Sequence, residues 1–141
     1  MADGTTPGDL GIDVQTATDS ALFRWFLASM LLGRPVNGTI ATRTYQALLA
    51  HDLDEPTAFG RMTHAQLRAV LDEGGYGRFD HRMADELQAT MRELQTRSIG
   101  IRVHSAASKA ELCRDLEQLR GVGPVTCEIF TRYLPRLAFA A

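Results

Sequence analysis

The chain has 141 residues, of which 15 are Lys or Arg and 17 are Asp or Glu, so its formal net charge is −2. Hydrophobic residues make up 45% of it, enough to offset the entropy of ordering one core, which excludes a disordered protein. This length is typical of a single domain. No apolar run approaches the ~18 residues of a membrane span, and the first residues lack the basic and then apolar pattern of a signal peptide. We therefore expect a cytoplasmic protein without a membrane partner.

The near-neutral total hides an uneven distribution of charge. Residues 1–91 contain 7 basic and 12 acidic side chains, net −5, whereas residues 92–141 contain 8 basic and 5 acidic side chains, net +3. All but one of those eight basic residues are arginines, whose guanidinium group suits bidentate contact with phosphate. The overall charge argues against non-specific coating of nucleic acid, and the basic second part indicates a ligand only together with a motif.

Helix signals begin after residue 17. Residues 1–17 are rich in Gly, Asp and Thr without a sustained period, which predicts a mobile leader. The polar residues 18–20 form a cap cluster, and apolar residues then recur at helical spacing. These are Leu22, Phe23, Phe26, Leu27, Met30 and Leu31. Gly and Pro in residues 33–38 end this helix, and the next helix is expected over residues 39–50, before a loop at 52–56 and a short turn at 57–60.

The second part of the chain predicts four more helices. Thr63 and Gln66 form a capping box, and the glycines of residues 74–77 end the helix that it starts. A long helix is expected over residues 78–97, then an extended connection over 98–105, where Ile99, Ile101 and Val103 alternate. A second capping box at residues 108–111 and Pro124 mark the last two helix starts. The predicted fold is an all-α orthogonal bundle of six or seven helices, with one domain over residues 18–141.

The most informative stretch joins the last two helices, at residues 116–133. Gly121 and Gly123 flank the apolar Val122, which allows a tight turn in which Val122 points inward and the backbone amides face outward. Amide groups at the start of a helix attract anions, because their donors are unpaired and the helix dipole favours negative charge. A phosphate can approach closely where side chains are absent.

At these residues the chain resembles the helix-hairpin-helix motif, whose usual core is Leu-x-Gly-Val-Gly-x-x-Thr-Ala. The matching residues are Leu119, Gly121, Val122, Gly123 and Thr126, while Arg120 stands where Pro is frequent and Cys127 replaces the small Ala. Around the motif, roughly residues 20–136 are similar to the helical domain of the DNA glycosylase superfamily that includes endonuclease III. A loop at residues 31–33 and a Gly-Tyr-Gly turn at residues 75–77 occur in the same order along this chain as the corresponding features in that family.

This resemblance implies DNA repair chemistry, in which a damaged base is flipped out and its glycosidic bond is cleaved. The family's nucleophilic lysine would fall at Val125, which cannot form a Schiff base. The family's aspartate beyond the second hairpin helix has no counterpart here, and Glu128 is the only acidic residue after the hairpin turn. The iron–sulfur loop of some relatives is absent, because the chain has only two cysteines. We therefore expect a protein that is not catalytic as the chain stands.

The expected interface with duplex DNA includes residues inside and outside the hairpin. Its members are Arg120, Gly121, Val122, Gly123, Val125, Thr126, Arg132 and Arg136, with Arg34 and Asn37 as groove probes from the loop after the first helix. For Asn37, a helix cap is the competing interpretation. The resemblance also implies a monovalent cation held by hairpin carbonyls. No other metal site is predicted, since the four histidines show no ligand spacing.

Two other residue groups have competing interpretations. Tyr76 and Phe79 beside Arg82 could stack on a base, or they could pack on the following helix. Cys113 and Cys127 are expected to be buried thiols.

Three functions remain open from the sequence. The first is non-specific binding of duplex DNA, which would place the protein at the nucleoid. The second is an active monofunctional DNA N-glycosylase whose acid comes from Glu128 or from a partner. The third is a helical interaction module that forms a homodimer through apolar residues of the C-terminal helix, namely Ile129, Phe130, Tyr133 and Leu137.

Overall fold

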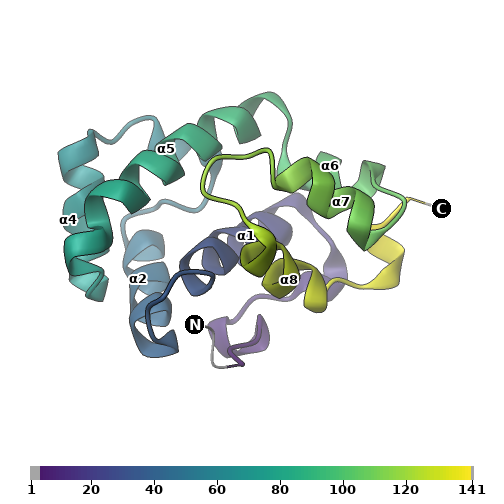
Figure 1. The fold of residues 1–141 in the computed structure, drawn as a ribbon, viewed down its shortest axis with the longest axis horizontal. Coiled ribbons are helices and arrows are strands. Elements are labelled where there is room, and N and C mark those ends of the chain that lie inside the picture. Colours follow the sequence, from purple (N-terminus) through teal and green to yellow (C-terminus); the bar gives the residue numbers. More distant parts are fainter. Residues whose placement is uncertain (1–3, 141) are drawn as a thin grey trace.

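The computed structural model describes residues 4–140, and within them it has eight α-helices and no strand (Figure 1). The α-helices are α1 (Asp19–Leu32), α2 (Gly38–Ala50), α3 (Pro56–Phe59), α4 (His64–Gly74), α5 (Asp80–Thr96), α6 (Ile99–Ser105), α7 (Lys109–Leu116) and α8 (Pro124–Arg132). Four 3-10 helices accompany them, η1 (Gly8–Leu10), η2 (Val14–Thr16), η3 (Gly77–Phe79) and η4 (Arg136–Ala138). The all-α prediction is confirmed. Within the described residues, no helix combines the length and the apolar character that crossing a bilayer requires.

Helix α1 lies at the centre of the fold, between α2 on one side and α6 and α8 on the other (Figure 1). It is apolar around most of its circumference, and a helix of that kind is stable only when other elements surround it. Trp25 and Phe26 are completely buried, and the Trp25 indole donates a hydrogen bond to the Phe130 carbonyl over 3.1 Å. The rings of Phe26 and Phe130 meet edge to face at 5.4 Å, so α8 is fixed directly onto the central helix.

The predicted helix starts are confirmed by their caps. The Thr18 hydroxyl accepts the Ala21 amide at the start of α1, and the capping box of Thr63 and Gln66 is complete in both directions at the start of α4. Ser108 accepts the amide of Glu111 at the start of α7. These caps act within one turn, which is why sequence spacing predicts them.

Residues 98–105 are a helix rather than the predicted extended connection. Ser98 caps α6, and the buried residues Ile99 and Val103 are four positions apart, whereas Ile101 is 53% exposed. The alternating apolar residues therefore belong to a helical pattern with one exposed member. The amide of Gly100 donates to Asp19 over 2.8 Å, and this long-range contact with α1 was not visible in the local pattern.

Two other segments differ from the prediction. Where the sequence predicts a mobile leader, Ile12 and Val14 are buried against the core; Val14 begins η2, and Ile12 lies between η1 and η2. Residues 1–3 of that leader lie outside the described residues. The turn predicted at residues 57–60 is the short helix α3, which begins with Pro56 at its first position. Helices α3 and α6 add to the six helices whose starts the sequence pattern marks, which gives the eight observed α-helices.

Helices α2 and α4 approach each other most closely at Gly74. A Cβ atom at this position would lie 2.4 Å from the Cα of Thr44 and 2.0 Å from its Oγ1. Thr44 is itself completely buried, and its hydroxyl donates to the Ile40 carbonyl of its own helix. The absence of a side chain at Gly74 therefore lets the two helix backbones touch.

Candidate nucleic-acid interface

The connection between α7 and α8 has the tight geometry that the two glycines predict. After α7 ends, the amide of Leu119 donates to the Leu116 carbonyl, and the amide of Val122 donates to the Leu119 carbonyl over 3.2 Å. Gly121 adopts φ +83°, in the left-handed region that favours glycine. Val122 is only 6% exposed, so it anchors the turn in the core as predicted.

The start of α8 is exposed and open. Gly123 is its N-cap residue, no side chain of the described residues caps this end, and Pro124 occupies the first helical position. A Cβ atom at Gly123 would meet no described atom within 4 Å, and the neighbouring Val125 is 43% exposed. Donor groups of a first helical turn that lack a capping side chain are available to water or to an anion.

Gly121 performs a different task from Gly123, because it faces the interior of the protein. A Cβ atom there would lie 2.8 Å from the Cβ of Glu86 and 2.9 Å from Nη2 of Arg34. That Nη2 donates to the Gly121 carbonyl over 2.6 Å and to Oε1 of Glu86 over 2.7 Å. We call Arg34, Glu86 and Gly121 the hairpin clamp, since it joins the turn to α5 and to the loop after α1.

Thr126, predicted to contact DNA, is instead a packing residue. It is 3% exposed, and a Cβ atom at Gly33 would lie 2.3 Å from its Oγ1. The first turn of α8 therefore lies directly on the end of α1. This close contact explains why the residues at both positions are small, Gly33 at the end of α1 and Thr126 on α8, without any need for a ligand.

The two residues expected to probe a DNA groove both have structural roles. Arg34 is half-buried in the hairpin clamp, so its guanidinium points into the protein rather than toward a groove. Asn37 accepts the Ile40 amide over 2.8 Å and caps α2, which supports the competing interpretation. These contacts give both side chains a structural role in the free protein, and their contact with a DNA groove stays a prediction.

The predicted basic residues are spread over the length of α8 and beyond. Arg120 is exposed in the hairpin turn, whereas Arg132 lies eight residues after Pro124, roughly 12 Å along the helix. Arg132 forms an ion pair with Glu128, and the hydrogen bonds that its guanidinium donates to that carboxylate raise the pKa of Arg132. Arg136 lies beside a separate cavity near the C-terminal end. Only Arg120 of these three therefore adds charge at the hairpin turn.

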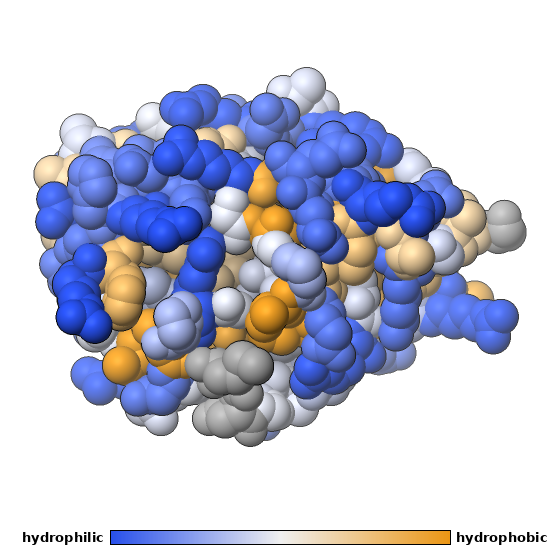
Figure 2. Space-filling model, in the orientation of Figure 1, coloured by the Kyte–Doolittle hydropathy of each residue, from blue (hydrophilic) through white to orange (hydrophobic). Residues whose placement is uncertain are grey.

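Some arginines in the basic second part of the chain have their charge neutralised by ion pairs within the protein. Arg97 and Arg102 both contact Asp115, over 3.0 and 2.8 Å. Arg102 is almost completely buried, so this pair joins α6 to α7 rather than presenting charge to a ligand. Figure 2 shows polar residues in blue over most of the face that carries the hairpin, with small apolar areas between them.

A small cleft adjoins the hairpin clamp. Its volume is about 150 Å³, and the side chains that line it are Arg34, Pro35, Tyr76, Phe79, Arg82, Met83 and Glu86. Tyr76 is 2% exposed and its hydroxyl donates to the Leu31 carbonyl, whereas Phe79 is 40% exposed, with the Arg78 guanidinium 5.1 Å from its ring centroid. Burial raises the pKa of Tyr76 well above its ordinary value, so the phenol remains protonated. Tyr76 thus packs, while Phe79 presents a ring at the cleft.

An acidic pair fixes the corner between α4 and α5 beside this cleft. Asp80, the first residue of α5, is buried and accepts a hydrogen bond from Nε of Arg68 over 3.1 Å. Burial opposes ionisation of Asp80, but hydrogen bonds from Asp72 and Arg68 outweigh it and lower the pKa of Asp80. Burial and the contact with Asp80 raise the pKa of Asp72. The pKa values of the two carboxyl groups are therefore pushed apart, so Asp80 ionises first and Asp72 keeps its proton to higher pH.

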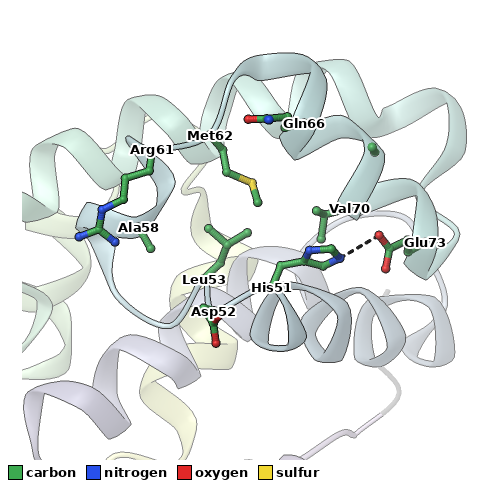
Figure 3. A pocket seen from close by; sticks show the side chains of 10 residues that line it. His51, Asp52, Leu53, Ala58, Arg61, Met62, Gln66, Val70 and Glu73 are labelled. Atoms are coloured by element: carbon green, nitrogen blue, oxygen red, sulfur yellow. Dashed lines mark hydrogen bonds and ion pairs between the residues drawn. The ribbon is translucent and has the colours of Figure 1, made fainter.

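Larger hollows lie elsewhere on the molecule. One, of about 530 Å³, lies between α2, α3 and α4, where the His51 imidazole is 2.9 Å from a Glu73 carboxylate oxygen (Figure 3). Another, of about 820 Å³, lies near the C-terminal end and includes Arg136 and Leu137. Neither is lined by hairpin residues.

The two cysteines come together where α7 packs on α8. Cys127 is 1% exposed and Cys113 is half-buried, so the expectation of buried thiols is met fully only by Cys127. Burial raises the pKa of the Cys127 thiol far above its ordinary value, and the neighbouring Cys113 raises it further. A protonated thiol is a weak nucleophile and a weak metal ligand.

Two further predictions depended on the hairpin and on α8. The carbonyl of Gly121 accepts a hydrogen bond from the Arg34 guanidinium and that of Arg120 accepts one from the Thr90 hydroxyl, so two of the carbonyls that could hold the implied monovalent cation already have a donor. The expected dimer face is mostly interior, because Ile129 and Phe130 are buried and only Leu137 is fully exposed, at 95%. Ile129 and Phe130, which the sequence offered for contact with a second copy, are thus core residues of this chain.

Sequence reasoning did not single out Glu86. Its neighbour Arg82 was part of the polar and aromatic cluster after the Gly-Tyr-Gly turn, but nothing local marks the acidic residue that faces Arg34 from 52 positions away.

Comparisons with protein-family models, with curated proteins and with solved structures found no match.

Proposed function

We propose that this protein binds the phosphate backbone of duplex DNA through residues 116–133, without sequence specificity and without catalysis as the chain stands. In this proposal the bundle is the orthogonal helical scaffold of base-excision-repair glycosylases, and the turn at residues 119–123 is their helix-hairpin-helix motif. The observation that carries the proposal is the uncapped and unobstructed start of α8 at Gly123.

Three features of the hairpin support a phosphate ligand. The first helical turn has no capping side chain, so its amide donors and the helix dipole both favour an anion. Arg120 is exposed in the same turn and adds a positive charge. The hairpin clamp and the buried Val122 hold the turn in one conformation, which lowers the entropic cost of binding.

Binding of a fluorescent DNA duplex is expected to weaken with salt. If Arg120 and the positive end of α8 neutralise one or two phosphates, the affinity should fall by roughly 3- to 12-fold between 50 and 200 mM salt. Fluorescence anisotropy at these two salt concentrations, with duplexes of two unrelated sequences, measures the slope and the lack of specificity. Absence of salt-dependent binding to either duplex would exclude the proposal.

Two substitutions at Gly123 separate DNA binding from folding. Gly123→Asp places a carboxylate that can cap α8 itself, so the fold is maintained while the anion site is blocked, and we expect at least tenfold weaker binding. Gly123→Ala adds a methyl group in open space without charge and should change the affinity less than about twofold. Equal affinities of the two variants would contradict phosphate binding at the start of α8.

A second candidate function, base excision, is favoured by the cleft beside the hairpin clamp. Its walls combine the exposed ring of Phe79 with the carboxylate of Glu86, which are groups able to stack on and to contact an extruded base. Glu86 lies in the cleft, whereas Glu128, the acid suggested by the sequence, is exposed on α8 and paired with Arg132. Glu86 is therefore the better placed carboxylate.

Duplexes that contain alkylated, oxidised or mismatched bases test this second function. If the cleft is catalytic, free base is released by the wild-type protein and release falls at least 100-fold in Glu86→Gln, as is usual when a general acid or base is removed. The amide of that variant still accepts hydrogen bonds from Arg34, so the clamp is retained. Circular dichroism checks its folding, and release of no base from any substrate supports the non-catalytic proposal.

A further inference from the structure

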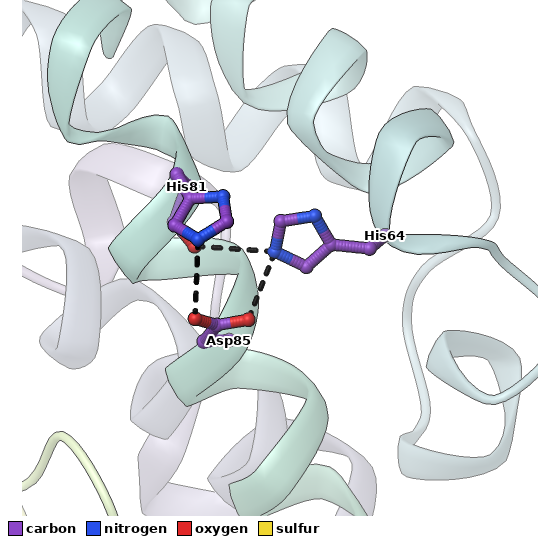
Figure 4. Close-up of side chains that lie close together, drawn as sticks. All are labelled: His64, His81 and Asp85. Atoms are coloured by element: carbon purple, nitrogen blue, oxygen red, sulfur yellow. Dashed lines mark hydrogen bonds and ion pairs between the residues drawn. The ribbon is translucent and has the colours of Figure 1, made fainter.

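Two histidines and an aspartate, none of which lines the cleft, converge at the corner between α4 and α5 (Figure 4). His64 is the first residue of α4, whereas His81 and Asp85 are one turn apart on α5. Nε2 of His64 lies 2.9 Å from Oδ1 of Asp85, and Nε2 of His81 lies 3.6 Å from Oδ2 of the same carboxylate. One potential ligand atom from each side chain lies within 4.8 Å of the other two.

We propose that His64, His81 and Asp85 form a binding site for one zinc ion. Zinc is bound in proteins by imidazole nitrogen and carboxylate oxygen at about 2.0–2.2 Å, which in a tetrahedral site places the ligand atoms roughly 3.3–3.6 Å apart. The two imidazole nitrogens lie 2.9 and 3.6 Å from the two oxygens of Asp85, so each is already near that separation from the carboxylate. Three protein ligands leave one position for water, which the partial exposure of all three side chains allows.

The backbone around the site is held in place without a metal. The capping box of Thr63 and Gln66 fixes the first turn of α4, where His64 lies. The ion pair of Arg68 and Asp80 holds α4 against the start of α5 on the same corner. The two imidazole rings are 4.6 Å apart, so the ligands need only small side-chain rotations to close around an ion.

A second cluster, Cys113, Glu117 and Cys127, is less suited to a metal. A thiol must lose its proton to bind zinc, and Cys127 is buried among groups that oppose this. The histidine cluster is exposed to solvent and needs only neutral imidazole. It also lies on the helix that supplies Arg82 and Glu86 to the cleft, so a bound ion would fasten α4 to the cleft wall.

Calorimetric titration of tag-free protein with Zn²⁺ tests the site. We expect one ion per chain, a higher melting temperature with Zn²⁺, and visible absorption of bound Co²⁺ typical of tetrahedral coordination. His81→Ala removes a ligand whose side chain is 65% exposed, so folding should be unaffected. Its affinity for Zn²⁺ should fall by more than about tenfold, since loss of even an outer partner of a metal ligand costs that much.

Two matched variants locate the ion. His51→Ala removes an imidazole that pairs with the single carboxylate of Glu73, and Cys113→Ser removes a thiol of the other cluster. Both should bind Zn²⁺ like the wild type. The proposal is overturned if wild-type protein binds no Zn²⁺ below about 100 μM, a weak affinity for three ligands, if His81→Ala binds undiminished, or if Cys113→Ser alone loses the ion.

Discussion

Gly74→Ala is expected to lower the free energy of unfolding by about 3 kcal/mol, at the upper end of the cost of overpacking. The added Cβ would lie 2.4 Å from the Cα of Thr44, and backbone atoms cannot rotate away. Because alanine normally stabilises a helix by up to about 1 kcal/mol relative to glycine, a destabilised variant is direct evidence of the clash. Urea unfolding followed by circular dichroism measures the change.

Gly60→Ala is the matched control for this experiment. Its added Cβ would meet its nearest neighbour, the carbonyl oxygen of Thr57, at 3.5 Å, an ordinary contact, and its φ is −72°. We expect its stability to remain within about 0.5 kcal/mol of the wild type. If both variants unfold at the same urea concentration, α2 and α4 do not touch as described.

Glu86→Ala is expected to destabilise the protein by about 2–3 kcal/mol, because it removes the carboxylate that faces a half-buried guanidinium. Loss of one partner of a fully buried pair costs about 3–5 kcal/mol, and the 23% exposure of the Arg34 side chain reduces that figure. The same substitution loosens the turn, since Arg34 also holds the Gly121 carbonyl. Thermal unfolding gives the loss, and hydrogen exchange at the hairpin amides should accelerate.

An exposed ion pair provides the comparison for the hairpin clamp. Glu128→Ala removes the partner of Arg132 on the surface of α8 and should cost less than about 1 kcal/mol. A double-mutant cycle with Arg34→Met then isolates the coupling between Arg34 and Glu86. A coupling energy near zero would show that the hairpin is held by packing alone.

The elements that depend on residues close together in the chain could be predicted from the amino-acid pattern. The cap of Thr18, the capping box of Thr63 and Gln66, and the tight turn at Gly121 all act within a few positions, so spacing predicted them. The all-α class followed from the same periodicity. The pattern at residues 98–105 misled because apolar residues that alternate over seven positions fit a short helix as well as a strand.

The roles of the predicted site residues depend instead on contacts between distant parts of the chain. Arg34 is an internal clamp because Glu86, 52 positions later, lies opposite it, and Thr126 packs because Gly33 lets α1 approach. His64 and His81 meet because α4 and α5 fold back on each other at the glycine turn. Burial and long-range pairing arise only when the chain packs, so the spacing of nearby residues cannot predict them. At Gly123 the local pattern predicted an exposed helix start, and the packed structure leaves the start of α8 uncapped and unobstructed.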